Sequence, residues 1–94
     1  MIIETADLTI KGYNSGKGVK IIHRSEKQII KFHQLRDLVI KEKPIIMTHC
    51  EIHYKPGQFI IKSYTDHVMS EKVIIIDEQQ HQNLMRFIMM DDEL

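Results

Sequence analysis

The first two dozen residues alternate between apolar and polar positions in two runs that a glycine-rich segment separates. In the first run Ile2, Ala6, Leu8 and Ile10 face one way, and the segment VKIIHR, residues 19–24, makes the second run. Alternation with a period of two is typical of a half-buried strand. The segment KGYNSGKG between them contains three glycines, an Asn and a Ser, which together indicate a turn. The pattern therefore predicts an N-terminal hairpin.

The spacing of apolar residues changes to that of a helix after Ser25. Ser25 and Gln28 have the spacing of a capping box, in which the two side chains cap the first turn of a helix. Pro44 disfavours helical geometry at the residue before it. We therefore expect a first helix over Glu26–Glu42. Its buried stripe consists of apolar residues at helical intervals: Ile29, Phe32, Leu35 and Val39.

The segment IIMTHCEIHYKPGQFIIKSYT consists of two alternating runs around Pro56 and Gly57, which predicts a second hairpin. Pairing Lys55 with Gln58 sets the register of the whole ladder. A slip of one residue would turn every side chain of a strand to the wrong face, so this register is well specified. The expected cross-strand pairs are Tyr54 with Phe59, His53 with Ile60, Ile52 with Ile61, Glu51 with Lys62, Cys50 with Ser63 and His49 with Tyr64.

A short apolar segment and a final helix complete the pattern. Val73–Ile76 is apolar at every position, which is typical of a strand covered on both faces. Asp77 and Gln80 make another capping box, so we expect the last helix over Glu78–Asp92. The resulting order is ββαβββα in one domain, residues 1–94. The fold class is α+β, an antiparallel sheet of about five strands with two helices.

Methionines crowd the end of the last helix. Every residue from Leu84 to Met90 except Arg86 is apolar, although a surface helix ordinarily buries a single stripe. Methionine is over-used at adaptable binding surfaces. We predict that Met85, Met89 and Met90 form a homodimer interface or the site for a protein partner. The alternative is a helix wedged between other elements of its own chain.

The overall charge argues against a nucleic-acid-binding protein. The chain has 13 basic and 13 acidic residues, so its formal net charge is zero, whereas phosphate binding usually requires a basic excess. We expect no tight binding of duplex nucleic acid. The alternative is a small nucleic-acid-binding module that uses lysines of the N-terminal hairpin and the first helix: Lys11, Lys17, Lys20, Lys27 and Lys31.

The segment THCEIHY contains the residue types of a metal site. In a strand, His49 and His53 share a face but lie about 13 Å apart, too far to ligate one ion through bonds of about 2 Å. We therefore expect no metal and no cofactor. The alternative is a metal-dependent activity at His49 and Glu51, with a third ligand such as His67. Cys50 points away from the adjacent histidines, so a Cys–His nucleophile is not expected, and we interpret the protein as non-enzymatic.

Composition bears on compartment and origin. A single cysteine, Cys50, fits a reducing compartment such as the cytoplasm, and no apolar run reaches the length of about 18 residues that a membrane span needs. Isoleucine is the most frequent residue and Ala6 is the only alanine, which indicates an AT-rich genome. We therefore expect a small regulatory or inhibitory factor, such as a phage or mobile-element accessory protein that binds a host protein.

Overall fold

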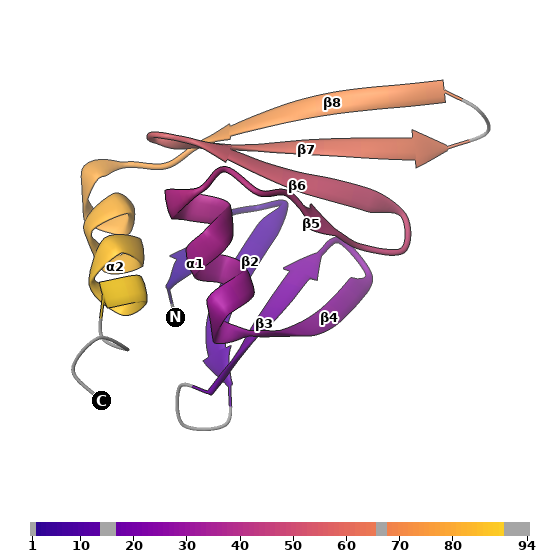
Figure 1. The fold of residues 1–94 in the computed structure, drawn as a ribbon. Helices are drawn as coiled ribbons and strands as arrows, with labels where there is room; N and C mark the ends of the chain where they lie inside the picture. The colour runs from indigo at the N-terminus through magenta and orange to yellow at the C-terminus, as the bar shows by residue number, and fades with distance from the viewer. Residues whose placement is uncertain (1, 14–16, 66–67, 90–94) are drawn as a thin grey trace.

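A computed structural model describes residues 2–13, 17–65 and 68–89 of the chain. Within these ranges the fold is α+β, as the sequence predicts. Eight strands form two four-stranded antiparallel sheets, and two helices complete the fold (Figure 1). The strand count exceeds the expected five because one predicted strand is divided, one predicted helix begins with a strand, and a short strand precedes the second hairpin.

The N-terminal sheet has its strands in chain order. The predicted strand over Ile2–Ile10 is divided by a tight turn at Thr5, whose hydroxyl donates to the carbonyl of Leu8 and accepts from the Leu8 amide at 2.9 and 3.0 Å. These two bonds fold the chain back on itself after only two strand residues. The strands are β1 (Ile3–Glu4), β2 (Leu8–Tyr13), β3 (Gly18–His23) and β4 (Glu26–Lys31).

The strand β4 occupies the segment that the sequence pattern assigned to the start of the first helix. Arg24, with a φ of 56°, and Ser25 form a two-residue turn after β3, and positive φ is typical of such tight hairpins. The ladder then pairs His23 with Glu26 and continues to Gly18 with Lys31. The prediction of a helix from Glu26 was wrong because this segment hydrogen-bonds to β3 instead of to itself.

The first helix, α1 (Phe32–Ile40), begins only after this ladder ends. The Gln34 side-chain oxygen accepts a hydrogen bond from the Lys31 amide at 2.9 Å, so half of a capping box forms six residues later than expected. Leu35 and Leu38 of α1 are fully buried. The second half of the predicted helix is therefore helical, and its apolar stripe faces the core as expected.

The C-terminal sheet also has its strands in chain order. Its central hairpin has the predicted register, from Lys55 opposite Gln58 to Cys50 opposite Ser63. Gly57, with a φ of 85°, lies in its turn, a conformation that favours glycine. The strands are β5 (Ile45–Ile46), β6 (Cys50–Lys55), β7 (Gln58–Thr65) and β8 (Val68–Ile75).

The apolar segment Val73–Ile76 is covered on one face only. Ile74 and Ile76 are buried, but Val73 is 50% exposed and Ile75 is 79% exposed. β8 is an edge strand that pairs with β7 alone. The prediction of a strand covered on both faces was wrong for this chain, because the second helix turns away after β8 and nothing in the described residues lies over the outer face.

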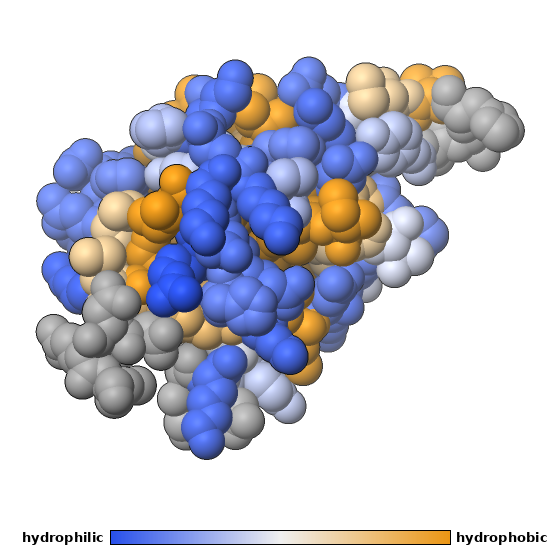
Figure 2. Space-filling view, viewed as in Figure 1, coloured by the Kyte–Doolittle hydropathy of each residue, from blue (hydrophilic) through white to orange (hydrophobic). Residues whose placement is uncertain are grey.

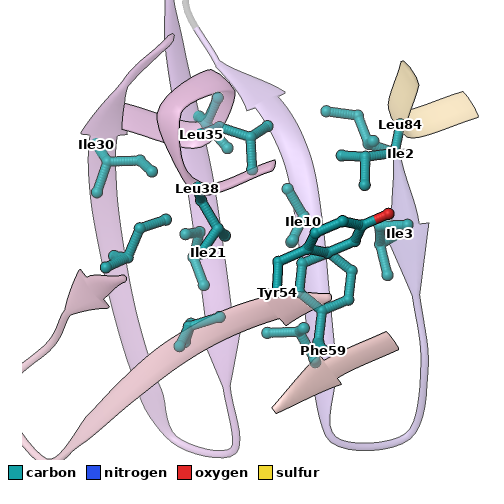
Figure 3. Packing of buried hydrophobic residues seen from close by; sticks show 14 of the residues in the cluster. Ile2, Ile3, Ile10, Ile21, Ile30, Leu35, Leu38, Tyr54, Phe59 and Leu84 are labelled. Atoms are coloured by element: carbon teal, nitrogen blue, oxygen red, sulfur yellow. The ribbon is translucent and has the colours of Figure 1, made fainter. Parts of the chain in front are cut away.

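The two sheets and both helices share one hydrophobic core (Figure 3). The rings of Tyr54 and Phe59 pack edge to face between the two sheets, with their centroids 5.1 Å apart. The second helix, α2 (Glu78–Met89), has the predicted cap, because Asp77 Oδ1 accepts a hydrogen bond from the Gln80 amide at 2.8 Å. Its buried residues are Leu84 and Ile88, and its predicted end at Asp92 lies outside the described residues.

Polar contacts fix the two sheets to each other outside the core. The Glu26 carboxylate, at the start of β4, accepts hydrogen bonds from the amides of Thr48 and His49 at 2.7 and 3.3 Å. On the other side, Lys72 of β8 forms an ion pair with Asp7 in the turn between β1 and β2. Its ammonium group holds the pKa of Asp7 below the ordinary value.

Candidate interaction surfaces

The strand β8 leaves one long edge of the C-terminal sheet open. Its exposed apolar side chains are large, and we define them as the β8 surface: Met69, Val73 and Ile75 on the outer face of the sheet, which are 58%, 50% and 79% exposed, and Val68 on the opposite face, which is 66% exposed. A long, apolar edge strand presents unpaired backbone groups together with apolar side chains, and soluble proteins ordinarily protect such edges. The β8 surface is therefore a candidate site for a partner.

Part of this surface lies on an arm that projects from the body of the protein. The ladder between β6 and β7 ends at Cys50 opposite Ser63, whereas the ladder between β7 and β8 continues to Thr65 opposite Val68. Figure 1 shows these two strands extending beyond the rest of the fold, and Figure 2 shows apolar residues at their outer end. Side chains on the arm have few neighbours of their own chain to cover them.

The outer face of the C-terminal sheet has a polar centre beside the β8 surface. Tyr64 donates a hydrogen bond from its hydroxyl to Glu51 at 2.8 Å. His53 Nε2 lies 3.4 Å from the same carboxylate, within ion-pair range although not aligned for a hydrogen bond. The hydrogen bond from Tyr64, and to a smaller extent the His53 imidazole, lowers the pKa of Glu51 below its ordinary value. The same hydrogen bond raises the pKa of Tyr64.

This arrangement bears on the metal hypothesis. Thr48 and His49 lie in the turn before β6, so the strand begins at Cys50, two residues later than the THCEIHY segment predicts, and the Glu51 carboxylate accepts a hydrogen bond from Tyr64. Among the described residues, no three His, Cys, Asp or Glu side chains are placed to hold one ion. His67, the suggested third ligand, lies outside those residues. The alternative of a metal site at His49 and Glu51 therefore gains no support from the described geometry.

Cys50 lies in the core instead of at a reactive surface. It is 3% exposed, and its thiol donates to Met47 Sδ at 3.9 Å. Burial raises the pKa of the Cys50 thiol above its ordinary value. Because the thiolate is the nucleophilic form, this cysteine is a weak nucleophile at neutral pH.

The methionines of the last helix have different surroundings. Met85 is partly buried and packs against the core, whereas Met89 is 55% exposed. Met90 lies outside the described residues. Their assignment to a dimer interface or a partner site stays a prediction, and of the two described residues only Met89 presents a mainly exposed side chain.

The five lysines of the nucleic-acid alternative come together on one surface. The register of β2, β3 and β4 turns the core residues Ile10, Ile21 and Ile30 inward and alternate residues outward. Lysines occupy four of the outward positions, and a fifth lies in the turn before β3. We define the lysine face by these residues: Lys11, Lys20, Lys27 and Lys31 on the strands, with Lys17 beside them.

Like charges lie next to one another on this face. Lys11 of β2 lies directly opposite Lys20 of β3, an arrangement that destabilises a sheet. No ion pair joins any lysine of this face to a carboxylate of the described residues. The register places one carboxylate on the same side of the sheet, that of Glu4 on β1 opposite Thr9. A protein with no net charge thus has one distinctly basic surface.

Comparisons with known proteins leave these surfaces to be interpreted from their own chemistry. No family model, no curated protein and no solved structure matches the chain. In the parts of the chain that the structure describes, neither helix is long and apolar enough to cross a membrane.

Sequence reasoning named the lysines of the lysine face but not their arrangement on one sheet, and it missed the exposure of the β8 surface. The arrangement was not predicted because Lys27 and Lys31 were assigned to a helix instead of to a strand beside the hairpin. The sequence does contain a signal for this strand. When the segments on either side of Arg24 and Ser25 are aligned as a hairpin with a two-residue turn, Lys20 lies opposite Ile29 and inward-facing and outward-facing positions alternate along both segments. The exposure of Ile75 had no local signal, because an apolar side chain looks the same in sequence whether or not another element covers it.

Proposed function

We propose that the protein is a small, non-enzymatic interaction factor that binds a protein partner by adding a strand to β8. The observation that carries this proposal is the exposure of Ile75, at 79%, on an edge strand with a free side. In strand addition the main chain supplies hydrogen bonds and alternate side chains supply specificity. The β8 surface offers both, because its apolar side chains accompany an unpaired backbone edge.

The first partner that we propose is a second copy of the chain. Two-fold association is the commonest arrangement of soluble oligomers, and antiparallel pairing of two β8 strands would join two C-terminal sheets into one. The pairing would cover Val73 and Ile75 of both copies. It would also protect an edge that otherwise promotes uncontrolled aggregation.

The same edge suits a regulatory role. A free strand edge binds an extended segment through the main chain and so places few demands on the partner's sequence. The composition, rich in isoleucine and lysine with Ala6 as the only alanine, supports an origin in an AT-rich genome. We therefore propose an accessory or inhibitory factor, such as one from a phage or mobile element, that binds a host protein in the cytoplasm.

The test compares two exposed isoleucines on opposite edges of one sheet. Ile75 lies next to the free side of β8, and Ile46, 60% exposed, lies on β5 at the other edge. We expect the wild type to be a dimer by light scattering at about 100 µM. Ile75→Lys should be monomeric with an unchanged circular dichroism spectrum, because an edge lysine opposes strand pairing. Ile46→Lys should remain dimeric.

Two results would count against the proposal. A wild type that is monomeric at this concentration refutes self-association. If Ile75→Lys also captures the same proteins from cells as the wild type does, the proposal that another protein binds at β8 is refuted as well. Met89→Lys separates this surface from the one that the sequence indicated. If only that variant dissociates the dimer, the interface is on α2 and not on β8.

A further inference from the structure

We propose that the lysine face is a binding site for single-stranded nucleic acid. This site lies on the N-terminal sheet and is independent of the β8 surface, so the two proposals can fail separately. It rests on three features of the described residues: the clustering of uncompensated lysines, an exposed aromatic ring at the end of the face, and a hollow between them.

The charge pattern of the described residues favours an anionic ligand. Lys11 and Lys20 oppose each other across β2 and β3 without a carboxylate between them, and adjacent strands are only about 5 Å apart. Lys27 and Lys31 extend the same surface across β4. A row of phosphates would neutralise these charges, and the release of counterions from the nucleic acid would drive binding.

An aromatic platform lies at one end of this surface. Tyr13 is 47% exposed although it belongs to a strand. It pairs with Gly18, and a Cβ atom built on Gly18 would lie 3.5 Å from the Tyr13 ring. The ring therefore lies along the sheet over the glycine, where its free side can stack on a base. Exposed aromatic rings beside a basic surface are typical of single-strand binding.

A hollow beside this ring has room for a base. It is open to solvent, measures about 340 Å³ and combines apolar with cationic groups. Ile29, 52% exposed, forms an apolar wall of the hollow. Gly18 has no side chain to fill the bottom of the hollow. The lining residues are Tyr13, Lys17, Gly18, Ile29, Ile30, Lys31 and Gln34.

The shape of the surface favours a single strand over a duplex. The lysine face spans three adjacent strands, whereas the major groove of DNA accepts a helix or a two-stranded ribbon. The surface of a sheet contacts phosphates and unstacked bases at the same time only when the bases are free to turn toward it.

Fluorescence anisotropy with labelled oligo(dT) and oligo(U) of about 12 nucleotides tests the proposal. Four phosphate contacts predict a slope of about −2.8 in the plot of log K against log salt, or a roughly 50-fold loss of affinity between 50 and 200 mM salt. The two probes distinguish DNA from RNA as the ligand. A duplex of the same length should bind more weakly than the single strands.

Matched variants separate this face from general charge. Lys20→Gln with Lys27→Gln should halve the salt slope and weaken binding at least tenfold at about 50 mM salt. Lys43→Gln with Lys55→Gln removes the same charge from exposed positions elsewhere and should change affinity less than threefold, a small change on the scale of one lost phosphate contact. Equal losses in both double variants would overturn the proposal, as would an absence of single-strand binding by the wild type.

The tyrosine tests the stacking itself. Tyr13→Phe should retain affinity, and Tyr13→Leu should lose about 5- to 150-fold, the range that corresponds to one stacked base. Thermal melts in parallel establish that both variants are folded. If Tyr13→Leu is folded and binds as the wild type does, or if the duplex binds more tightly than the single strands, the assignment to single-stranded nucleic acid is wrong.

Discussion

Two adjacent isoleucines distinguish the strand β4 from the helix that the sequence pattern predicts. In the structure Ile30 is 4% exposed and Ile29 is 52% exposed. In a helix over Glu26–Glu42 the buried residue would instead be Ile29, on the stripe with Phe32. Because both residues are isoleucine, the same substitution at each position reports directly on which side chain is buried.

The expected magnitudes follow from burial. Replacing isoleucine with alanine removes Cγ1, Cγ2 and Cδ1, worth about 2.4 kcal/mol when these carbons are fully buried. With the cavity that remains, Ile30→Ala should lower the free energy of unfolding by about 3 kcal/mol. Ile29→Ala loses about half of the transfer energy and leaves no cavity, so it should cost about 1 kcal/mol. Any change in strand propensity is shared by both variants.

Urea denaturation followed by far-ultraviolet circular dichroism measures this difference. With a slope of about 1 kcal/mol per molar urea, the midpoint of Ile30→Ala should lie about 2 M below that of Ile29→Ala. If Ile29→Ala is equally or more destabilising, Glu26–Lys31 is not the strand described here. The lysine face would then be wrong as well, because only the strand places Lys27 and Lys31 beside Lys20.

Two further predictions concern polar groups. Burial lowers the pKa of His23 below its ordinary value of 6.5, so the unfolded chain takes up a proton at a higher pH than the folded chain does, and the free energy of unfolding should fall as the pH drops below 6.5. His23→Gln should flatten this pH dependence in urea titrations between pH 7.5 and about 5. An equal flattening caused by a substitution at the exposed His33 would contradict the assignment to His23. Glu26→Ala leaves two backbone amides without their acceptor and should lower the free energy of unfolding by about 1–2 kcal/mol. Glu71→Ala, at an exposed position, should change the free energy of unfolding by no more than about 0.5 kcal/mol. Equal losses of stability in thermal melts of the two variants would show that Glu26 does not join the sheets.

The elements that the sequence predicted correctly are those set by neighbours in the chain. The register of β6 and β7 follows from alternation on either side of Gly57, because a slip would place Ile52 and Ile61 on the solvent face. The start of α2 follows from Asp77, whose side chain reaches an amide three residues away. Both depend on contacts that a short segment makes within itself, so a short segment of sequence contains the information.

Pairing with the neighbouring strand β3 decided the strand β4, and the place of β8 in its sheet decided the exposure of Ile75. The segment Glu26–Lys31 contains two adjacent isoleucines, which fit a helix and a strand equally well, and the free edge of β3 selected the strand by supplying hydrogen-bond partners. In the same way Ile75 is exposed because β8 is the last strand of its sheet. The sequence determines which side chains share a face, but whether another element covers that face depends on contacts between segments far apart in the chain.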